Sequence, residues 1–151
     1  YDKDGNMKDW WTASDGENFN KRAGMYADFF SKIKVLPDLN ANGRFTLGEN
    51  LADHGGLQVS YEAFKEATKN APLKTIDGLT PEQRFFIAYA GVWAANITEA
   101  EIRQRTKSDP HALGKWRVDG ALPHIGMWYD AFGVKAGDKM FIPVDQRLKL
   151  W

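Results

Sequence analysis

Four segments of this chain open with the same helix-start pattern, a Ser or Thr followed three residues later by Glu or Gln. In this capping box the hydroxyl accepts a hydrogen bond from the first helical turn, while the Glu or Gln side chain reaches back to the cap. Apolar residues at helical spacing follow the first three boxes, and a polar segment follows the fourth. The sequence therefore predicts helices over residues 14–36, 46–70, 82–95 and 98–108, beginning at Ser14, Thr46, Thr80-Pro81 and Thr98.

The rest of the chain is predicted to be less regular. Residues 1–9 and 38–44 are polar turns or loops, residues 116–118 favour a short strand, and residues 123–132 have helical character. The helix over residues 82–95 is apolar nearly all round, which predicts that it is buried. With 151 residues, of which 43% are apolar, the chain is expected to form a single domain, mainly α with little β structure.

Composition excludes several functional classes. Twenty basic residues balance twenty acidic ones, so the overall charge offers no basis for binding nucleic acid. The chain has no cysteine and therefore no disulfide and no thiolate metal site. We also predict no membrane span in this chain, because no apolar run reaches about 18 residues.

The stretch from Gly48 to Gly56 carries two carboxylates, Glu49 and Asp53, at a spacing that places them on one face of a helix. Gly within a helix costs about 1 kcal/mol relative to Ala, so Gly55-Gly56 predicts a close approach by another element. Three interpretations of Glu49 remain open. The simplest is that Glu49 is the last residue of the capping box begun by Thr46.

A second interpretation is a calcium loop that ends at Glu49. The spacing of Asp38, Asn40, Asn42, Gly43 and Glu49 matches the twelve-residue pattern of oxygen ligands with a turn at the sixth position. Only two of these ligands are charged, which predicts weak affinity. On this reading the chain is a non-enzymatic calcium-binding module.

The third interpretation is a zinc site. A helical carboxylate can complete a tetrahedral site begun by two histidines, and a second carboxylate one turn on can orient a ligand histidine. This accounts for Glu49, Asp53 and the glycines together. However, His54, His111 and His124 are the only histidines, and none forms the His-Glu-x-x-His pattern that usually supplies the other ligands.

Five segments, in the right order, resemble the neprilysin and endothelin-converting-enzyme family of zinc metallopeptidases. The most specific is Gly48–Leu57, which resembles the zinc-ligand segment of that family. Three of the others are residues 4–12 with Asp9-Trp10-Trp11-Thr12, residues 83–93 with Gly91-Val92-Trp93, and residues 109–118 with Asp109-Pro110-His111. The last is the terminal Trp151. The resemblance implies the C-terminal helical subdomain of a zincin-like catalytic domain.

The resemblance also implies roles for individual residues. Glu49 would be the third zinc ligand, and Asp53 would orient a ligand histidine. His111 would donate a hydrogen bond to the oxyanion of the tetrahedral intermediate, and Arg117 would bind a substrate backbone carbonyl. The walls of an apolar pocket for the residue after the scissile bond would include Val92 and Trp93. Without the resemblance, these side chains are an exposed His, a surface Arg and two core residues.

The chain also differs from the family pattern. The segment with two zinc-binding histidines and the general-base Glu is expected upstream of Tyr1, and the large N-terminal helical region is missing. We therefore expect residues 1–151 to be one subdomain of a zinc-dependent metalloendopeptidase that cleaves short peptides, inactive without the rest of its parent chain. A parent with a degenerate zinc motif, and hence an inactive homologue, is the alternative. The resemblance implies a location outside the cytoplasm.

Overall fold

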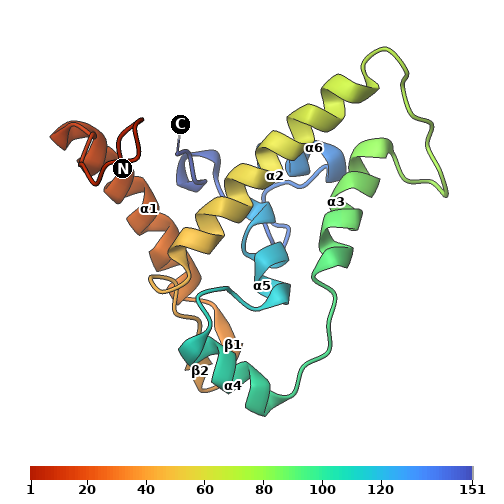
Figure 1. The fold of residues 1–151 in the computed structure, drawn as a ribbon. Helices are drawn as coiled ribbons and strands as arrows, with labels where there is room; N and C mark the ends of the chain where they lie inside the picture. Colours follow the sequence, from red (N-terminus) through yellow and green to blue (C-terminus); the bar gives the residue numbers. More distant parts are fainter. Residues whose placement is uncertain (151) are drawn as a thin grey trace.

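The computed structural model describes residues 1–150, so Trp151, the last segment of the resemblance, lies outside the described residues. Six α-helices dominate this part of the chain (Figure 1), which confirms the mainly α fold class. They are α1 (Ala13–Ser31), α2 (Leu47–Thr68), α3 (Pro81–Val92), α4 (Glu99–Ser108), α5 (Gly114–Asp119) and α6 (Gly126–Phe132). Two short 3-10 helices, η1 (Leu122–His124) and η2 (Val144–Gln146), lie near the C-terminus.

The only sheet within residues 1–150 is a hairpin of β1 (Lys34–Leu36) and β2 (Leu39–Asn40). The two strands pair antiparallel, with an irregular register between Lys34 and Leu36. Strand β2 lies in the segment predicted to be a polar loop, whereas β1 replaces the end of the helix predicted over residues 14–36, because α1 ends at Ser31. No helix of the described residues has the length and apolar character needed to span a membrane.

Helix α2 crosses the middle of the molecule and contributes to both halves of the core (Figure 1). Its buried residues recur every three or four positions and so form a single stripe: Asn50, His54, Leu57 and Tyr61. Leu57 and Tyr61 pack with α3, η1 and α6, where Phe86, Leu122, Ile125, Trp128 and Tyr129 are buried. The other cluster joins α1 to the C-terminal tail through Tyr26, Phe30, Leu148 and Leu150.

One of the four predicted capping boxes is complete, and a second has its hydroxyl bond alone. Thr80 accepts from the backbone N of Gln83 at 3.2 Å, and Gln83 Oε1 accepts from the backbone N of Thr80 at 3.0 Å, with Pro81 in the first turn. Thr98 likewise accepts from the backbone N of Glu101 at 3.2 Å. These helix starts are therefore encoded locally.

The other two predicted caps are wrong. Helix α1 is capped by Thr12, not Ser14, because the Thr12 hydroxyl accepts from the backbone N of Asp15. Thr46 makes no side-chain cap bond, since its hydroxyl donates to the Asn42 carbonyl and accepts from the buried Asn50 amide. Glu49 consequently takes no part in a Thr46 capping box.

Three further predictions about packing are corrected. Residues 116–118 are not a strand but part of α5, where Arg117 N bonds to the Leu113 carbonyl at 3.1 Å and no neighbouring strand is needed. Helix α3 is not buried all round, because Phe86 alone is buried while Val92 is 72% exposed. The close approach predicted at Gly55-Gly56 is absent at Gly56, where an added Cβ would meet no atom within 4 Å.

Replacing Thr80 with alanine is expected to lower the free energy of unfolding by about 1 kcal/mol, because the Gln83 backbone N loses the hydroxyl that accepts its hydrogen bond, while the backbone N of residue 80 can still donate to Gln83. Urea denaturation of the 151-residue chain measures this change. Thr75→Ala, in the exposed loop before α3, is the matched control and should leave stability within about 0.5 kcal/mol of the wild type. Equal stability of the two variants would show that the Thr80 hydroxyl contributes nothing to the helix start.

Candidate active site

Glu49 lies in the first turn of α2, where its side chain faces His111 of the loop between α4 and α5. Glu49 Oε2 is 3.2 Å from His111 Nε2, and both side chains are about half exposed, at 44% and 41%. Because Glu49 is not engaged in a capping box, its carboxylate is free to meet groups on this face. The structure thus brings together two residues that are 62 positions apart in the chain.

The second ring nitrogen of His111 contacts Asp109. Asp109 Oδ1 lies 2.8 Å from His111 Nδ1 and accepts from the His111 backbone N at 2.9 Å. These bonds, together with that to Arg105, lower the pKa of Asp109 to about 2, so its carboxylate is ionised near neutral pH. A carboxylate only accepts hydrogen bonds, so His111 donates to Asp109 from Nδ1, and its Nε2 is the ring nitrogen that faces Glu49.

Asp53, one helical turn after Glu49, is paired with Arg117 of α5. Arg117 Nε and Nη2 donate to the two carboxylate oxygens of Asp53, both at 2.6 Å, in the bidentate geometry of a strong charge-assisted pair. The two side chains are only 13% and 15% exposed. The structure therefore fixes the orientation of the Arg117 guanidinium through Asp53.

Two aromatic residues of α3 and its C-cap hold Arg117 from the other side. Arg117 Cζ lies 3.8 Å from the centroid of the Trp93 ring, a cation–π arrangement. The Tyr89 hydroxyl donates to the Arg117 carbonyl at 2.9 Å, and burial, followed by the charge of Asp53, raises the pKa of Tyr89 to about 12. Arg117 is therefore constrained at both its side chain and its backbone.

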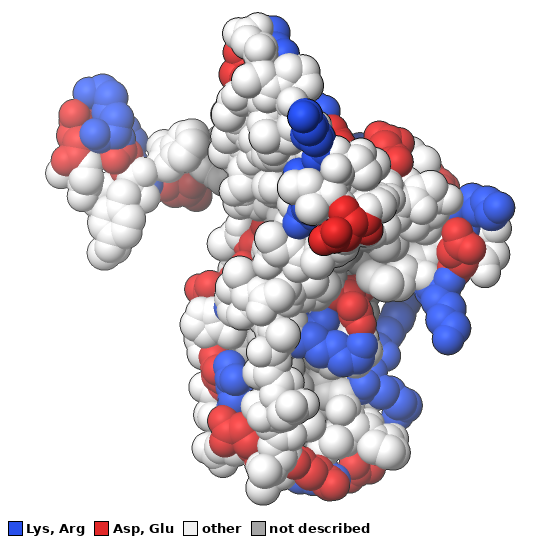
Figure 2. Space-filling view, turned by 90° about the vertical axis from the view of Figure 1, so that its right-hand side faces the viewer, with Lys and Arg blue, Asp and Glu red and all other residues white. Residues whose placement is uncertain are grey.

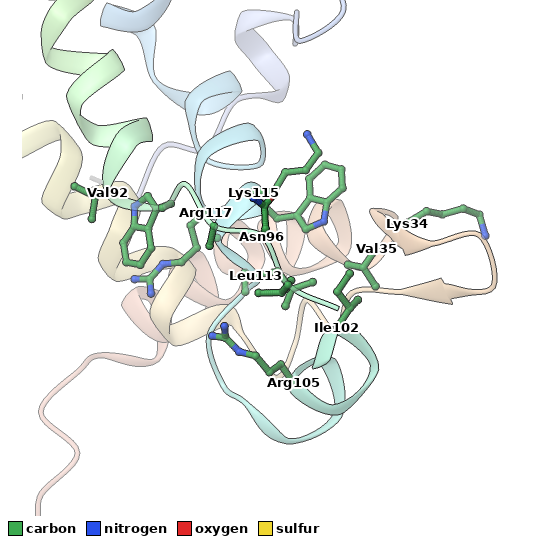
Figure 3. Close-up of a pocket in the computed structure, with 15 residues that line it drawn as sticks. Lys34, Val35, Val92, Asn96, Ile102, Arg105, Leu113, Lys115 and Arg117 are labelled. Carbon is green, nitrogen blue, oxygen red and sulfur yellow. The ribbon is translucent and has the colours of Figure 1, made fainter. Parts of the chain in front are cut away.

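A cavity of about 560 Å³ opens beside this cluster (Figure 3). The end of α3, the first residues of α5 and parts of α4 and β1 form its walls. Figure 3 shows Val92 and Arg117 at one end, with the Arg105 side chain extending toward the same open space. The lining combines apolar side chains with four cations, Lys34, Arg105, Lys115 and Arg117.

The predicted site residues thus fall into one cluster, with some unpredicted members. Glu49, Asp53, His111 and Arg117 lie together, and Val92 and Trp93 line the adjacent cavity. Sequence reasoning missed the Asp53–Arg117 pair, the Glu49–His111 contact and the contacts of Asp109 and Arg105. Only Asp109 left a local signal, since an Asp two residues before a His can bond to its amide and ring.

The side chains of the predicted calcium loop have different partners. Asp38 pairs with Arg103 through both carboxylate oxygens, at 2.9 and 3.0 Å. Asn40 donates to the Ser31 carbonyl, and Asn42 accepts from the backbone N of Phe45. Glu49 faces His111 instead. No observed contact favours the calcium interpretation.

The metal-binding capacity of these residues is limited to part of a site. Glu49 offers a half-exposed carboxylate, which is a suitable zinc ligand. Within residues 1–150 no three or more His, Cys, Asp or Glu side chains come together as a group that could hold a metal ion. A catalytic zinc takes about three protein ligands, so a site that included Glu49 would need others from outside these residues.

Comparison with known proteins agrees with this architecture. A sequence model of Peptidase family M13 matches residues 1–148. An endothelin-converting enzyme homolog of Locusta migratoria is 36% identical over 143 residues, which is 93% of this chain and 20% of that protein. Human endothelin-converting enzyme 1 is 34% identical over 155 residues, covering 100% of this chain and 20% of that protein.

Solved structures give the same result. The crystal structure of Mycobacterium tuberculosis zinc metalloprotease ZMP1 in complex with an inhibitor matches with a TM-score of 0.94 at 32% identity, covering 100% of this chain and 24% of that one. The chain thus spans about a fifth of the length of the curated relatives it matches. The family model, the relatives and the fold together confirm the resemblance to neprilysin and endothelin-converting enzymes: this chain belongs to peptidase family M13.

Proposed function

We propose that the protein containing this chain is a zinc-dependent metalloendopeptidase of short peptides, and that Glu49 supplies one of its zinc ligands. The observation that carries the proposal is that Glu49, which faces His111, and Asp53, which pairs with Arg117, lie one turn apart on α2, with Arg117 also lining the cavity. One carboxylate is not a zinc site, so residues 1–151 alone should not cleave peptides. By family likeness we place the protein outside the cytoplasm.

The cavity would receive the peptide. Arg117 uses Nε and Nη2 for Asp53, which leaves Nη1 to donate to a backbone carbonyl of the substrate. Val92 and Trp93 would form apolar walls for the residue after the scissile bond. Because Asp53 and Trp93 fix the guanidinium, little rotational freedom would be lost on binding. Asp53 would also orient a zinc-ligand histidine from outside this chain.

His111 would stabilise the tetrahedral intermediate. Its Nδ1 is held by Asp109 and its Nε2 lies 3.2 Å from Glu49 Oε2, so that Nε2, when it carries a proton, would present an N–H donor close to the proposed metal ligand. A donor fixed in this way can bond to the developing oxyanion without reorganisation. Zinc, when bound, would polarise the scissile carbonyl and acidify a water molecule.

The experiment uses the full-length protein and measures zinc per chain and cleavage of a fluorogenic short peptide. Glu49→Gln is expected to lower both by at least about tenfold, because a neutral amide is a poorer zinc ligand than a carboxylate. Glu62→Gln, exposed on the same helix, is the matched control and should leave both unchanged. Wild-type zinc content and cleavage in Glu49→Gln would refute the proposal, and a wild-type protein without zinc would favour an inactive homologue.

A further inference from the structure

We infer that Arg105 is a positioning residue for His111 and acts through Asp109. The inference rests on the proposed function of His111 as an oxyanion donor. Its basis is a chain of contacts that runs from α4 to the proposed active site. Arg105 lies in the last turn of α4, and Asp109 is the C-cap of that helix.

The two oxygens of Asp109 have separate tasks. Oδ2 accepts from Arg105 Nε at 3.0 Å and from Arg105 Nη2 at 2.8 Å. Oδ1 meets only His111, through its backbone N and its ring Nδ1. Because both oxygens belong to one planar group, fixing Oδ2 also fixes the direction in which Oδ1 faces the imidazole.

His111 depends on this arrangement because little else holds its ring. The side chain is 41% exposed and lies in the loop between α4 and α5. Its one other polar side-chain contact among the described residues is with Glu49, which would bind zinc in the intact enzyme. When Glu49 binds zinc, the Arg105–Asp109 pair would be what holds the His111 ring in its orientation.

The forked geometry of arginine suits this task. Two N–H groups of one guanidinium converge on a single oxygen, whereas a Lys ammonium would act as a flexible point charge. Arg103, two residues earlier on the same helix, provides a contrast. Arg103 bonds to Asp38 and Glu99 at exposed positions and has no contact with Asp109 or His111 in the described residues.

Arg105 also stabilises the last turn of α4 as an i,i+4 partner of Asp109, so a purely structural role must be separated from positioning. Steady-state kinetics of the full-length protein separates them, since loss of orientation affects the transition state more than substrate binding. Arg105→Ala is expected to lower kcat about tenfold with KM within about twofold of the wild type. Arg105→Lys should retain intermediate kcat, and Arg103→Ala should match the wild type.

A double-mutant cycle with Asp109→Ala provides the second test. If Arg105 acts only through Asp109, adding Arg105→Ala to Asp109→Ala lowers kcat no further. Three results would each overturn the inference while peptide cleavage by the wild type stands. The first is a further loss of kcat when Arg105→Ala is added to Asp109→Ala. The others are an increase of KM at unchanged kcat in Arg105→Ala, and equal kcat in Arg105→Ala and Arg103→Ala. A wild-type protein that cleaves no peptide would reject the proposed function itself, and the inference with it.

Discussion

Replacing Arg117 with methionine is expected to lower the free energy of unfolding by about 3 kcal/mol, because the change leaves the Asp53 carboxylate unpaired in a largely buried position. Asp53 is 13% exposed and receives two hydrogen bonds of 2.6 Å from Arg117. The methylene groups of methionine preserve much of the packing against the Trp93 ring. The loss therefore comes from the charge and not from a cavity. Urea denaturation of the 151-residue chain measures it.

A matched exposed pair provides the control. Arg103 also binds Asp38 through two nitrogens, and Glu99 besides, but Arg103 is 39% exposed and each of the two carboxylate side chains is 65% exposed. Arg103→Met should cost less than about 1 kcal/mol, because solvent already screens the pair. The double variant Asp53→Asn with Arg117→Met should recover much of the loss, since no buried charge then lacks a partner. Equal losses in Arg117→Met and Arg103→Met would contradict the assigned role of burial.

In the full-length protein the same Arg117→Met variant should raise KM for peptides, because the proposed contact with a substrate backbone carbonyl is lost. Short peptide substrates of matched length measure this effect. A variant with unchanged KM and kcat would remove Arg117 from the proposed binding site, whatever its effect on stability. The two measurements thus test the structural and the functional role of one residue separately.

The helices that could be predicted from sequence were those with signals confined to a few neighbouring residues. Thr80, Pro81 and Gln83 complete one helix start among themselves, and the Thr98 hydroxyl caps the next helix by accepting from the backbone N of Glu101. Thr46 failed as a cap because Asn50, which is buried, bonds to its hydroxyl. That competition depends on the burial of one face of α2, which local sequence does not specify.

Short and isolated patterns were less informative. Residues 116–118 have the composition of a strand, but three residues cannot distinguish a strand from one turn of helix. Helix α3 was predicted to be buried from its apolar content, whereas Ile87 and Val92 are 45% and 72% exposed. The apolar content of a helix predicts that some of its residues are buried, but it does not show which faces of the helix are covered by other elements.

The candidate site illustrates the same limit. Family resemblance selected Glu49, Asp53, His111 and Arg117 one by one, and the structure places them together. Their pairing could not be predicted, because Asp53 and Arg117 are 64 positions apart and meet only when α5 packs near α2 and α3. The role of Asp53 toward a ligand histidine remains a prediction beside its observed pairing with Arg117.

Acidification from about pH 7.5 to about pH 5 is expected to lower the free energy of unfolding by about 4 kcal/mol through His54 and His124. The rings are only 1% and 3% exposed. Burial lowers the pKa of His54 from 6.5 to about 4. Burial, with the charges of His54 and Arg147, lowers the pKa of His124 to about 3.

The sign follows from which state takes up protons. As the pH falls through 6.5, the unfolded chain protonates both histidines while the folded chain keeps them neutral, so stability decreases until the folded pKa values are reached. Near pH 5 each ring accounts for about 2 kcal/mol. The carboxyl of Asp109, with its pKa lowered to about 2, loses its own contribution only at lower pH and does not interfere.

His54→Leu isolates one of the two contributions. Neither ring nitrogen of His54 has a hydrogen-bond partner among the described residues, so leucine leaves no protein group unpaired. The same change at His124 would remove the acceptor of the buried Leu148 amide, which donates to Nδ1 at 3.0 Å. Urea denaturation at several pH values should give His54→Leu about half the wild-type loss. If His54→Leu loses as much stability on acidification as the wild type does, the acid sensitivity comes from groups other than His54.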